Sequence, residues 1–425
     1  MLFDRFRLFR PRLPSALVLL GALLLASPAG AQSLLQALRQ GTPTLQLLPA
    51  FEYKSVDDAT RPARQLGLRS RVGYRSGEFA GFQAYLQLHN VSHAEEAFRF
   101  VQDGRVRGER DRDLIADPDG SRVHQACLDY LAPAQTRLRL GRQEIVLDDA
   151  RLIGNVDWRL NGQSFDALSL TSQPLADLSL FAAAINQVNT ITLDRFDLDH
   201  LYLFNARYRL ASFASLTGYL YLLDSEDRRA SARDSATWGV RLAGQQAGWS
   251  YAVDLARQDD YADGDNQGGR FCSLFARYQF APLFGLGAGY SRISGQDGSD
   301  RPFDTLFSTA HKFNGWADLF LATNGGSLWG GLEDAFVEAG GKLLGNGWLV
   351  RYHRFEASDS GNAGRPAFDG GYGDEIDIQF DRPLTDNLSV LAKYAFYNAR
   401  DSRANGVANP TADTEIFWLR LNWQY

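Results

Sequence analysis

The chain ends in the nine residues Phe417-Trp418-Leu419-Arg420-Leu421-Asn422-Trp423-Gln424-Tyr425. Large apolar side chains fall on every second position, and an aromatic residue comes last. In a β-strand the apolar set would share one face, with Trp418, Arg420, Asn422 and Gln424 on the other. A last strand of this kind is typical of bacterial outer-membrane barrels. A strand of a soluble sandwich could show the same alternation, so other segments must decide.

The amino terminus predicts export. A basic stretch precedes the apolar run at residues 15–26, and the small residues Ala29-Gly30-Ala31 follow it. This order is that of a Sec-type signal peptide, here residues 1–31, with cleavage after Ala31. No later run reaches about 18 consecutive apolar residues, so any membrane would have to be crossed by strands.

Segments of about ten residues with apolar side chains on alternate positions recur along the mature chain. They predict an all-β fold, a membrane-spanning antiparallel up-and-down β-barrel of about 18 strands over residues 44–425. An even number is usual for bacterial single-chain barrels. The predicted strands lie near residues 44–54, 65–76, 79–91, 122–131, 136–147, 163–172, 177–189, 199–211, 214–225, 234–245, 248–260, 268–281, 284–295, 330–342, 347–358, 373–382, 387–399 and 413–425.

The links between these segments alternate in length. Turn residues fill the short links at 76–78, 132–134, 173–176, 281–283 and 345–347. Long loops are expected near 92–121, 148–162, 296–329, 359–372 and 400–412. Outer-membrane barrels have short periplasmic turns and long outer loops, whereas a soluble sandwich has no reason to sort its loops by side.

The residues before the first strand, 32–43, are expected to form a short periplasmic segment. Within it, residues 33–41 carry a pattern that fits a short helix stopped by Gly41. Such a helix would cap the periplasmic mouth, and an unordered tail is the alternative.

Side chains that face the lumen follow from the alternation, if the apolar positions of each strand face lipid. The wall is then rich in arginine, and an anion could bind along it because charged rings set the selectivity of a pore. The predicted lumen residues are Arg69, Arg71, Arg75, Arg137, Arg139, Arg207, Arg209, Arg241, Arg277, Arg351, Lys393 and Arg420.

Acidic residues also face inward and would pair with some of these cations, namely Asp254, Asp334, Glu338, Glu375, Asp377 and Asp381. A lattice of salt bridges that braces or fills the lumen is therefore an alternative to a cationic track. Only four of the 44 basic residues are lysines, and the guanidinium fork suits carboxylates such as those of uronates. A GC-rich genome would give the same bias.

Several segments together resemble the alginate export family of outer-membrane proteins. In the first half of the chain they are Leu138-Arg139-Leu140-Gly141-Arg142-Gln143-Glu144-Ile145, Arg151-Leu152-Ile153-Gly154, Trp158-Arg159 and Phe165-Asp166-Ala167. In the second half they are Phe303-Asp304-Thr305-Leu306-Phe307, His311-Lys312-Phe313, Gly315-Trp316-Ala317-Asp318, Tyr352-His353-Arg354-Phe355 and Tyr372-Gly373-Asp374-Glu375-Ile376-Asp377.

The resemblance implies an eighteen-stranded barrel in the Gram-negative outer membrane through which an anionic, alginate-like polysaccharide leaves the periplasm. Arginines would bind its carboxylates, loops would gate the ends, and a polymer-synthesis complex would lie beneath the pore. Lipid and lipopolysaccharide would surround a monomer. A porin for small anionic solutes such as sugar acids, and a structural or adhesive barrel with a filled lumen, are the alternatives.

Two loops are expected to decide between an open and a filled lumen. The loop at 148–162 would fold inward as a constriction, and the loop at 296–329 would form a lid or an inward plug. If both lay inside a lattice of ion pairs, no path would remain. The predicted gating residues are Asp149, Arg151, Asp157, Trp158, Arg159, His311 and Lys312.

Other chemistry is disfavoured. The chain carries a formal charge of -6, and loss of residues 1–31 removes four arginines and Asp4 and leaves -9, which argues against nucleic-acid binding. Cys127 and Cys272 are expected to be small wall residues. No hydrolase, nucleotide or zinc motif occurs, so we expect no enzyme, catalytic residue, cofactor or metal. The acidic stretch 259–266 fails the EF-hand pattern, and only a weak divalent site stays open there.

Overall fold

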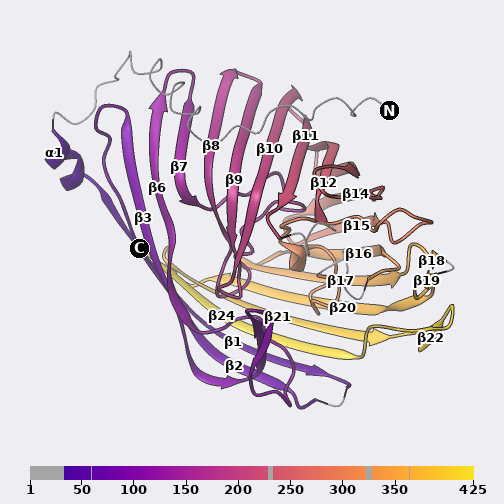
Figure 1. The fold of residues 1–425 in the computed structure, drawn as a ribbon. Coiled ribbons are helices and arrows are strands. Elements are labelled where there is room, and N and C mark those ends of the chain that lie inside the picture. The colour runs from indigo at the N-terminus through magenta and orange to yellow at the C-terminus, as the bar shows by residue number, and fades with distance from the viewer. Residues whose placement is uncertain (1–32, 59, 228–232, 322–327, 363) are drawn as a thin grey trace.

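The computed structural model describes residues 33–58, 60–227, 233–321, 328–362 and 364–425, and the predicted signal peptide lies outside them. Within these residues, eighteen antiparallel strands form one sheet, which closes where β1 (Thr42–Val56) pairs with β24 (Thr414–Gln424). The predicted barrel is therefore confirmed (Figure 1). The remaining barrel strands are β2 (Ala63–Arg75), β3 (Phe82–Ala97), β6 (Gly120–Ala132), β7 (Thr136–Gln143), β8 (Ser164–Leu175), β9 (Leu178–Asn189), β10 (Arg195–Ala211), β11 (Ala214–Ser225), β12 (Ser235–Gln246), β13 (Trp249–Asp260), β14 (Arg270–Ala281), β15 (Phe284–Ile293), β16 (Leu332–Leu343), β17 (Asn346–Glu356), β20 (Gly371–Pro383) and β21 (Leu388–Ala399).

The alternation of side chains works as the sequence predicts. Along β2, Leu66 and Val72 are 44% and 56% exposed on the outer face, whereas Arg69 and Arg71 between them are buried on the inner face. An apolar outer face is what a strand in lipid requires. Within the described residues no helix is long and apolar enough to cross a membrane.

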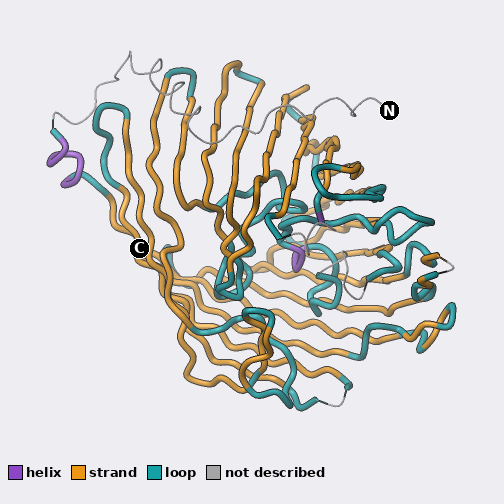
Figure 2. Tube along the Cα trace, viewed as in Figure 1, coloured by secondary structure: helices purple, strands orange, loops and turns teal. Residues whose placement is uncertain are grey.

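Turns and loops are sorted by side, as Figure 2 shows. At one end of the barrel the turns are short: Leu344 and Gly345, both with positive φ, join β16 to β17 in the conformation that two-residue hairpins favour. At the other end the long loops carry three small hairpins that the sequence did not predict. These are β4 (Arg99–Gln102) with β5 (Arg105–Gly108), β18 (Gly361–Asn362) with β19 (Arg365–Pro366), and β22 (Arg403–Ala404) with β23 (Val407–Ala408).

Two long loops fold back into the barrel. We call residues 144–163 loop A and residues 303–320 loop B. The two loops contact each other through a parallel β-bridge between Ile153 and Phe307, in which Gly154 N donates a hydrogen bond to Phe307 O at 2.9 Å. In Figure 2 loops and the short 3-10 helix η4 (Ala310–Lys312) lie inside the ring of strands.

The inward loops bring apolar packing into the lumen. Leu201 and Leu203 of β10 and Tyr221 and Leu223 of β11 face inward, and each is at most 2% exposed. They belong to one apolar cluster with Phe307 of loop B. The assumption that apolar residues face lipid is therefore wrong for this part of the wall, because a loop packs on its inner face.

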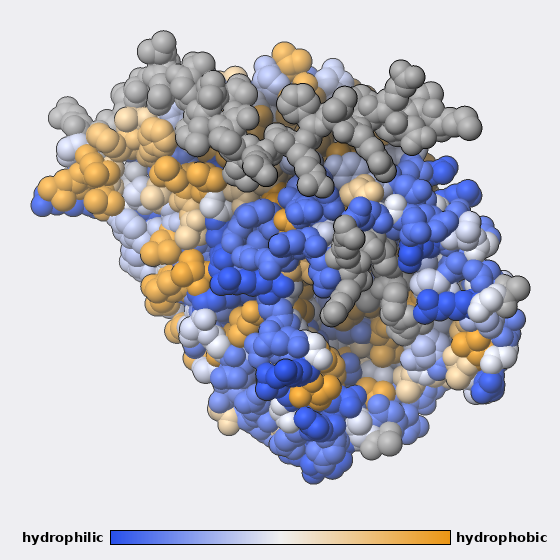
Figure 3. Space-filling model, in the orientation of Figure 1, coloured by the Kyte–Doolittle hydropathy of each residue, from blue (hydrophilic) through white to orange (hydrophobic). Residues whose placement is uncertain are grey.

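A short helix precedes the barrel. Ser33 caps the N-terminus of helix α1 (Leu34–Arg39), because its side chain accepts a hydrogen bond from Gln36 N. Gly77 N donates to Ala37 O at 2.8 Å, and the outward-facing Tyr74 hydroxyl donates to Leu38 O. The helix thus lies beside the wall at the β2–β3 turn, not across the mouth (Figure 1). Figure 3 shows apolar residues gathered over this side of the molecule.

Candidate functional site

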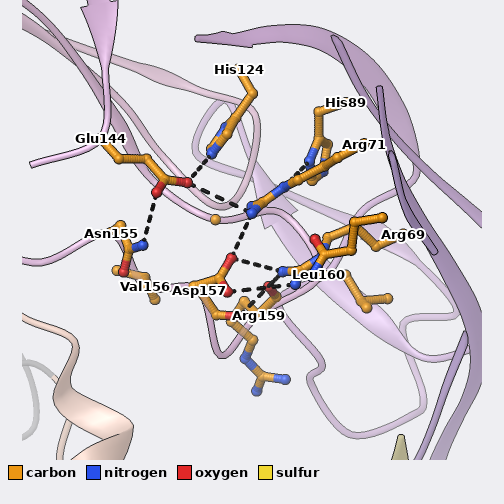
Figure 4. A network of polar contacts seen from close by, with 12 residues as sticks. Arg69, Arg71, His89, His124, Glu144, Asn155, Val156, Asp157, Arg159 and Leu160 are labelled. Carbon is orange, nitrogen blue, oxygen red and sulfur yellow. Dashed lines mark hydrogen bonds and ion pairs between the residues drawn. The ribbon is translucent and has the colours of Figure 1, made fainter. Parts of the chain in front are cut away.

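The candidate site is the constriction where loops A and B meet the barrel wall. Its first element is a carboxylate held by two arginines of β2. Asp157 Oδ1 accepts from Arg69 Nη1 at 2.9 Å and lies 2.8 Å from Arg71 Nη1. The two arginines are 2% and 6% exposed, while the Asp157 side chain is 42% exposed. Figure 4 shows this arrangement.

A second carboxylate extends the network at the start of loop A. Glu144 lies 2.6 Å from His124 Nε2, accepts from Asn155 Nδ2 at 3.1 Å, and lies 3.7 Å from Arg71 Nη1 (Figure 4). Burial alone would raise the pKa of Glu144, but the contact with His124 and the charge of Arg71 lower that pKa to about 2. Glu144 is therefore ionised at neutral pH.

Arg159 of loop A is the centre of a buried ion cluster. Its guanidinium contacts Glu52 of β1 at 2.9 Å, Asp117 of the loop between β5 and β6 at 3.5 Å and Asp318 of loop B at 3.2 Å. Burial lowers its pKa, and the three carboxylates outweigh burial and raise it. Four separate segments of the chain are thus tied together at one point.

An aromatic cage surrounds Lys393 of β21. Its Nζ lies 3.4 Å from the ring centre of Trp316 and 4.2 Å from that of Trp158, and 2.7 Å from His311 Nε2. The rings of Trp158 and His311 stack at 4.0 Å. The guanidinium carbon of Arg420 of β24 lies 3.6 Å from the ring centre of Trp158, and Arg420 also donates a hydrogen bond to the carbonyl oxygen of Trp158. Cation–π contacts of this kind are strongest where water is excluded.

His311 also joins the cage to the ion cluster. Its Nδ1 lies 2.7 Å from Asp318 Oδ1. Burial, together with nearby Lys393, lowers the pKa of His311 to about 3, although Asp318 opposes the shift. Burial would raise the pKa of Asp318, and His311 and Arg159 instead lower it to about 2. At neutral pH the imidazole is therefore neutral and Asp318 is ionised.

Several predicted lumen residues lie on the wall away from this constriction. Arg139 binds Asp129 through two nitrogens at 2.6 and 2.7 Å, and Arg75 lies 3.8 Å from the same carboxylate. Arg137 is half-buried on the same strand face as Arg139. Arg75 and Arg139 thus share the single carboxylate of Asp129, with Arg137 nearby, and this part of the wall keeps a net positive charge.

Other predicted residues form separate pairs. Arg241 contacts Asp149 of loop A at 2.7 Å and Asp254 at 3.3 Å. Arg277 and Arg351 share Glu338, at 2.7 and 2.6 Å. These pairs fit the salt-bridge lattice that the sequence left open as an alternative.

Two predicted gating residues hold loop A to loop B. Arg151 donates to Asn314 at 3.0 Å and lies over the rings of Phe271 and Phe313. Lys312 Nζ donates to the carbonyl oxygen of Asp149 at 3.1 Å.

The predicted residues Arg207 and Arg209 have a different setting. They lie near the end of β10 next to the short turns, and their side chains are 50% and 60% exposed. Arg207 contacts Asp148 at 3.0 Å and Arg209 contacts Asp177 at 2.6 Å. Both line a cavity of about 430 Å³ at the end of the barrel that carries the short turns.

Two residues of the buried ion cluster, Glu52 and Asp117, are not predicted by the sequence. Glu52 alternates with Phe51 and Tyr53, so the rule used for the other strands would have placed it inward. Asp117 lies in a loop without periodicity, and no local signal indicates that it reaches the lumen. Trp316 lies in the loop that the sequence predicts as a lid or an inward plug.

A family model described as alginate export matches residues 60–326. No curated protein matches at a significant level. Among solved structures, the chain is similar to OccK9 (OpdG) of Pseudomonas aeruginosa, with TM-score 0.69, 17% identity, and coverage of 91% of this chain and 99% of that one.

Two further structures give the same result. OccAB4 of Acinetobacter baumannii has TM-score 0.67 and 13% identity, and covers 91% of this chain and 98% of its own. The outer membrane protein opdK of Pseudomonas aeruginosa has TM-score 0.66 and 14% identity, with 91% and 99% coverage. At these identities the likeness establishes the fold alone.

Proposed function

We propose that this chain, which belongs to the alginate export family, is a gated channel that releases an anionic, uronate-type polysaccharide. The family and the barrel make it an outer-membrane channel of a Gram-negative bacterium. The substrate and the arginine-lined path are our proposal. The channel would be a monomer that performs no catalysis, with a polymer-synthesis complex on the periplasmic side.

The observation that carries this proposal is the position of Asp157. A carboxylate from a loop, not from the wall, occupies the fork between Arg69 and Arg71. Paired guanidinium groups that bind one carboxylate would bind the carboxylate of a uronate in the same geometry. Asp157 therefore stands in for the substrate when the lumen is closed.

A gate of this kind opens when loop A leaves the wall. Asp157 and Arg159 both belong to loop A, and their partners Arg69 and Glu52 belong to strands that stay fixed. Binding of a uronate at Arg69 would replace one carboxylate by another, so the buried charge would stay compensated. A ligand can shift such an equilibrium only because it binds the open form better.

The second candidate is a porin for small sugar acids. It is favoured by the size of the cavities near the short turns, about 430 Å³ beside Arg207 and about 470 Å³ beside Arg277, which suit one or two sugar units. A structural barrel with a filled lumen is the third candidate, and the ion pairs of loops A and B favour it.

Single-channel recording in planar bilayers separates the three candidates. Asp157→Asn leaves the buried guanidinium of Arg69 without its carboxylate partner in the closed form. We expect this to destabilise the closed form by roughly 3 kcal/mol and to increase the ratio of open to closed channels about a hundredfold. Its current should be anion-selective and blocked by a hexauronate, but not by a neutral hexasaccharide. Asp177→Asn is the matched control, because it removes an arginine partner outside the constriction.

Each alternative has its own result. Absence of current from Asp157→Asn would indicate a filled barrel. A current that monouronate blocks as well as hexauronate would favour the small-solute porin. A current indifferent to both would contradict the proposed uronate path.

A further inference from the structure

Four arginines gather on the outer hairpin formed by β4 and β5 and its flanks. Arg99, Arg105, Arg107 and Arg110 line a cavity of about 650 Å³ together with Val106. Arg105, Arg107 and Arg110 are exposed, and Arg99 is half-buried. We call these four residues the outer arginine cluster.

The outer arginine cluster has little compensating charge around it: Arg99 helps to lower the pKa of Asp58, after the hydrogen bonds from Thr60, but does not form an ion pair with it. Among the described residues no carboxylate lies within ion-pair distance of these four guanidinium groups. The nearby Glu109 and Asp111 are taken by other cations, since Arg61 and Arg112 contact Glu109 at 3.5 and 2.6 Å and Arg61 contacts Asp111 at 2.6 Å. This differs from the constriction, where the arginines are paired.

The hairpin lies on the lumen side of the outer rim. Phe98 and Phe100 at its base pack with Ala63, an inward-facing residue of β2. At its tip, Asp103 N donates to Asp194 of the β9–β10 loop at 2.9 Å. Because β3, β6, β7 and β8 separate β2 from β9 around the barrel, the hairpin spans part of the mouth.

The chain that follows the hairpin enters the lumen. Asp117 is fully buried, contacts Arg159 at 3.5 Å, and accepts from Leu160 N of loop A at 2.8 Å. The cluster is thus joined to the constriction by a few residues. Because its hairpin spans part of the mouth, a polymer that left the lumen would pass near it. A site for lipid would instead be expected on the outward faces of the strands.

We propose that the outer arginine cluster is a docking site for the carboxylates of a polyanionic polysaccharide at the channel exit. This inference rests on the proposed function and extends it to the outer surface. Successive uronate units carry charges at intervals that several guanidinium groups can bind at once, so weak single contacts combine. The site would hold the emerging chain and disfavour its return.

Fluorescence anisotropy of labelled hexauronate with the full-length mature protein in detergent tests this site. We expect Arg105→Glu with Arg107→Glu to weaken binding to the otherwise wild-type barrel about tenfold at low salt, and less as salt increases. The matched control is Arg257→Glu with Arg403→Glu, which makes the same charge change elsewhere near the outer end and should keep wild-type affinity.

The outcomes separate this inference from the proposed function. Equal affinity of the hairpin variant and the wild type would overturn the docking site even if Asp157→Asn conducts and is blocked. Loss of bound rough lipopolysaccharide with unchanged hexauronate binding would also overturn it, since the cluster would then serve a lipid. Selective loss of hexauronate affinity would support it whether or not Asp157→Asn conducts.

Discussion

Two pairs of arginines on the barrel wall share one sequence pattern but not one environment. Arg69 and Arg71 of β2 and Arg207 and Arg209 of β10 both alternate with apolar residues and face the lumen. The first pair is buried under Asp157, and the second pair is half or more exposed. The strand determines that an arginine side chain faces the lumen. The loop that covers the side chain determines whether a ligand can reach it.

The difference has an energetic origin. A buried arginine without a partner would cost several kcal/mol, so Arg69 requires Asp157 or a substitute, whereas Arg71 also has Glu144 at 3.7 Å. The exposed pairs of Arg207 and Arg209 are solvated and screened, and contribute about 1 kcal/mol or less each. Strong and selective binding is therefore expected at the first pair, and weak attraction at the second.

The largest difference is expected when each arginine pair is neutralised in the Asp157→Asn background. Arg69→Gln with Arg71→Gln should weaken hexauronate block about a hundredfold, since two charge-assisted hydrogen bonds are worth roughly 3 kcal/mol. Arg207→Gln with Arg209→Gln should weaken it by about threefold at low salt. The measurement is the concentration that halves the single-channel current. Equal losses would show that burial does not distinguish the two pairs.

A smaller effect is expected from the cage that holds loop A. Trp158→Ala removes the ring that contacts both His311 and Arg420. We expect the closed form to lose about 2 kcal/mol of stability, which increases the open-to-closed ratio about thirtyfold. Trp249→Ala is the control, because Trp249 is an exposed ring near the short turns. Open probability is measured in planar bilayers, and unchanged gating by Trp158→Ala would exclude the cage as a closing element.

The smallest effect is expected from pH. His311 has a pKa lowered from 6.5 to about 3 in the closed form, and exposure on opening would restore the ordinary value. Protons therefore bind the open form better, and the closed form loses stability as pH falls from 6.5 towards 3. Asp318 and Glu144, with pKa values lowered to about 2, act in the same direction at lower pH.

We expect the open-to-closed ratio to increase about twenty-five-fold between about pH 7 and about pH 5. His311→Gln should remove most of this change, because neither Asp318 nor Glu144 titrates in that range. Recording the same channel at both pH values provides the check. A pH-independent wild type would show that His311 stays buried when the channel opens.

The sequence predicts the wall much better than what fills it. Along β2, Leu66, Leu68 and Val72 alternate with polar and charged residues, so the face of each side chain can be inferred residue by residue. The rule fails where a loop packs on the inner face, as at Leu201 and Leu203 of β10. Loop A and loop B have no such period. The motifs predict Trp158, Arg159 and His311 as gating residues. The contacts of Trp158 with Lys393 and of Arg159 with Glu52 depend on distant strands that only the closed barrel brings together.

The closing seam of the barrel also has a consequence for assembly. Gln46 pairs with Gln424 across the β1–β24 seam, so residues near opposite ends of the chain must meet before the wall is continuous. Contacts between such distant residues form late, because the entropy of closing a long chain opposes them. Arg420 of this last strand holds Trp158. The constriction is therefore completed only by the final strand, and a barrel whose seam has not formed lacks one of the contacts that close the constriction.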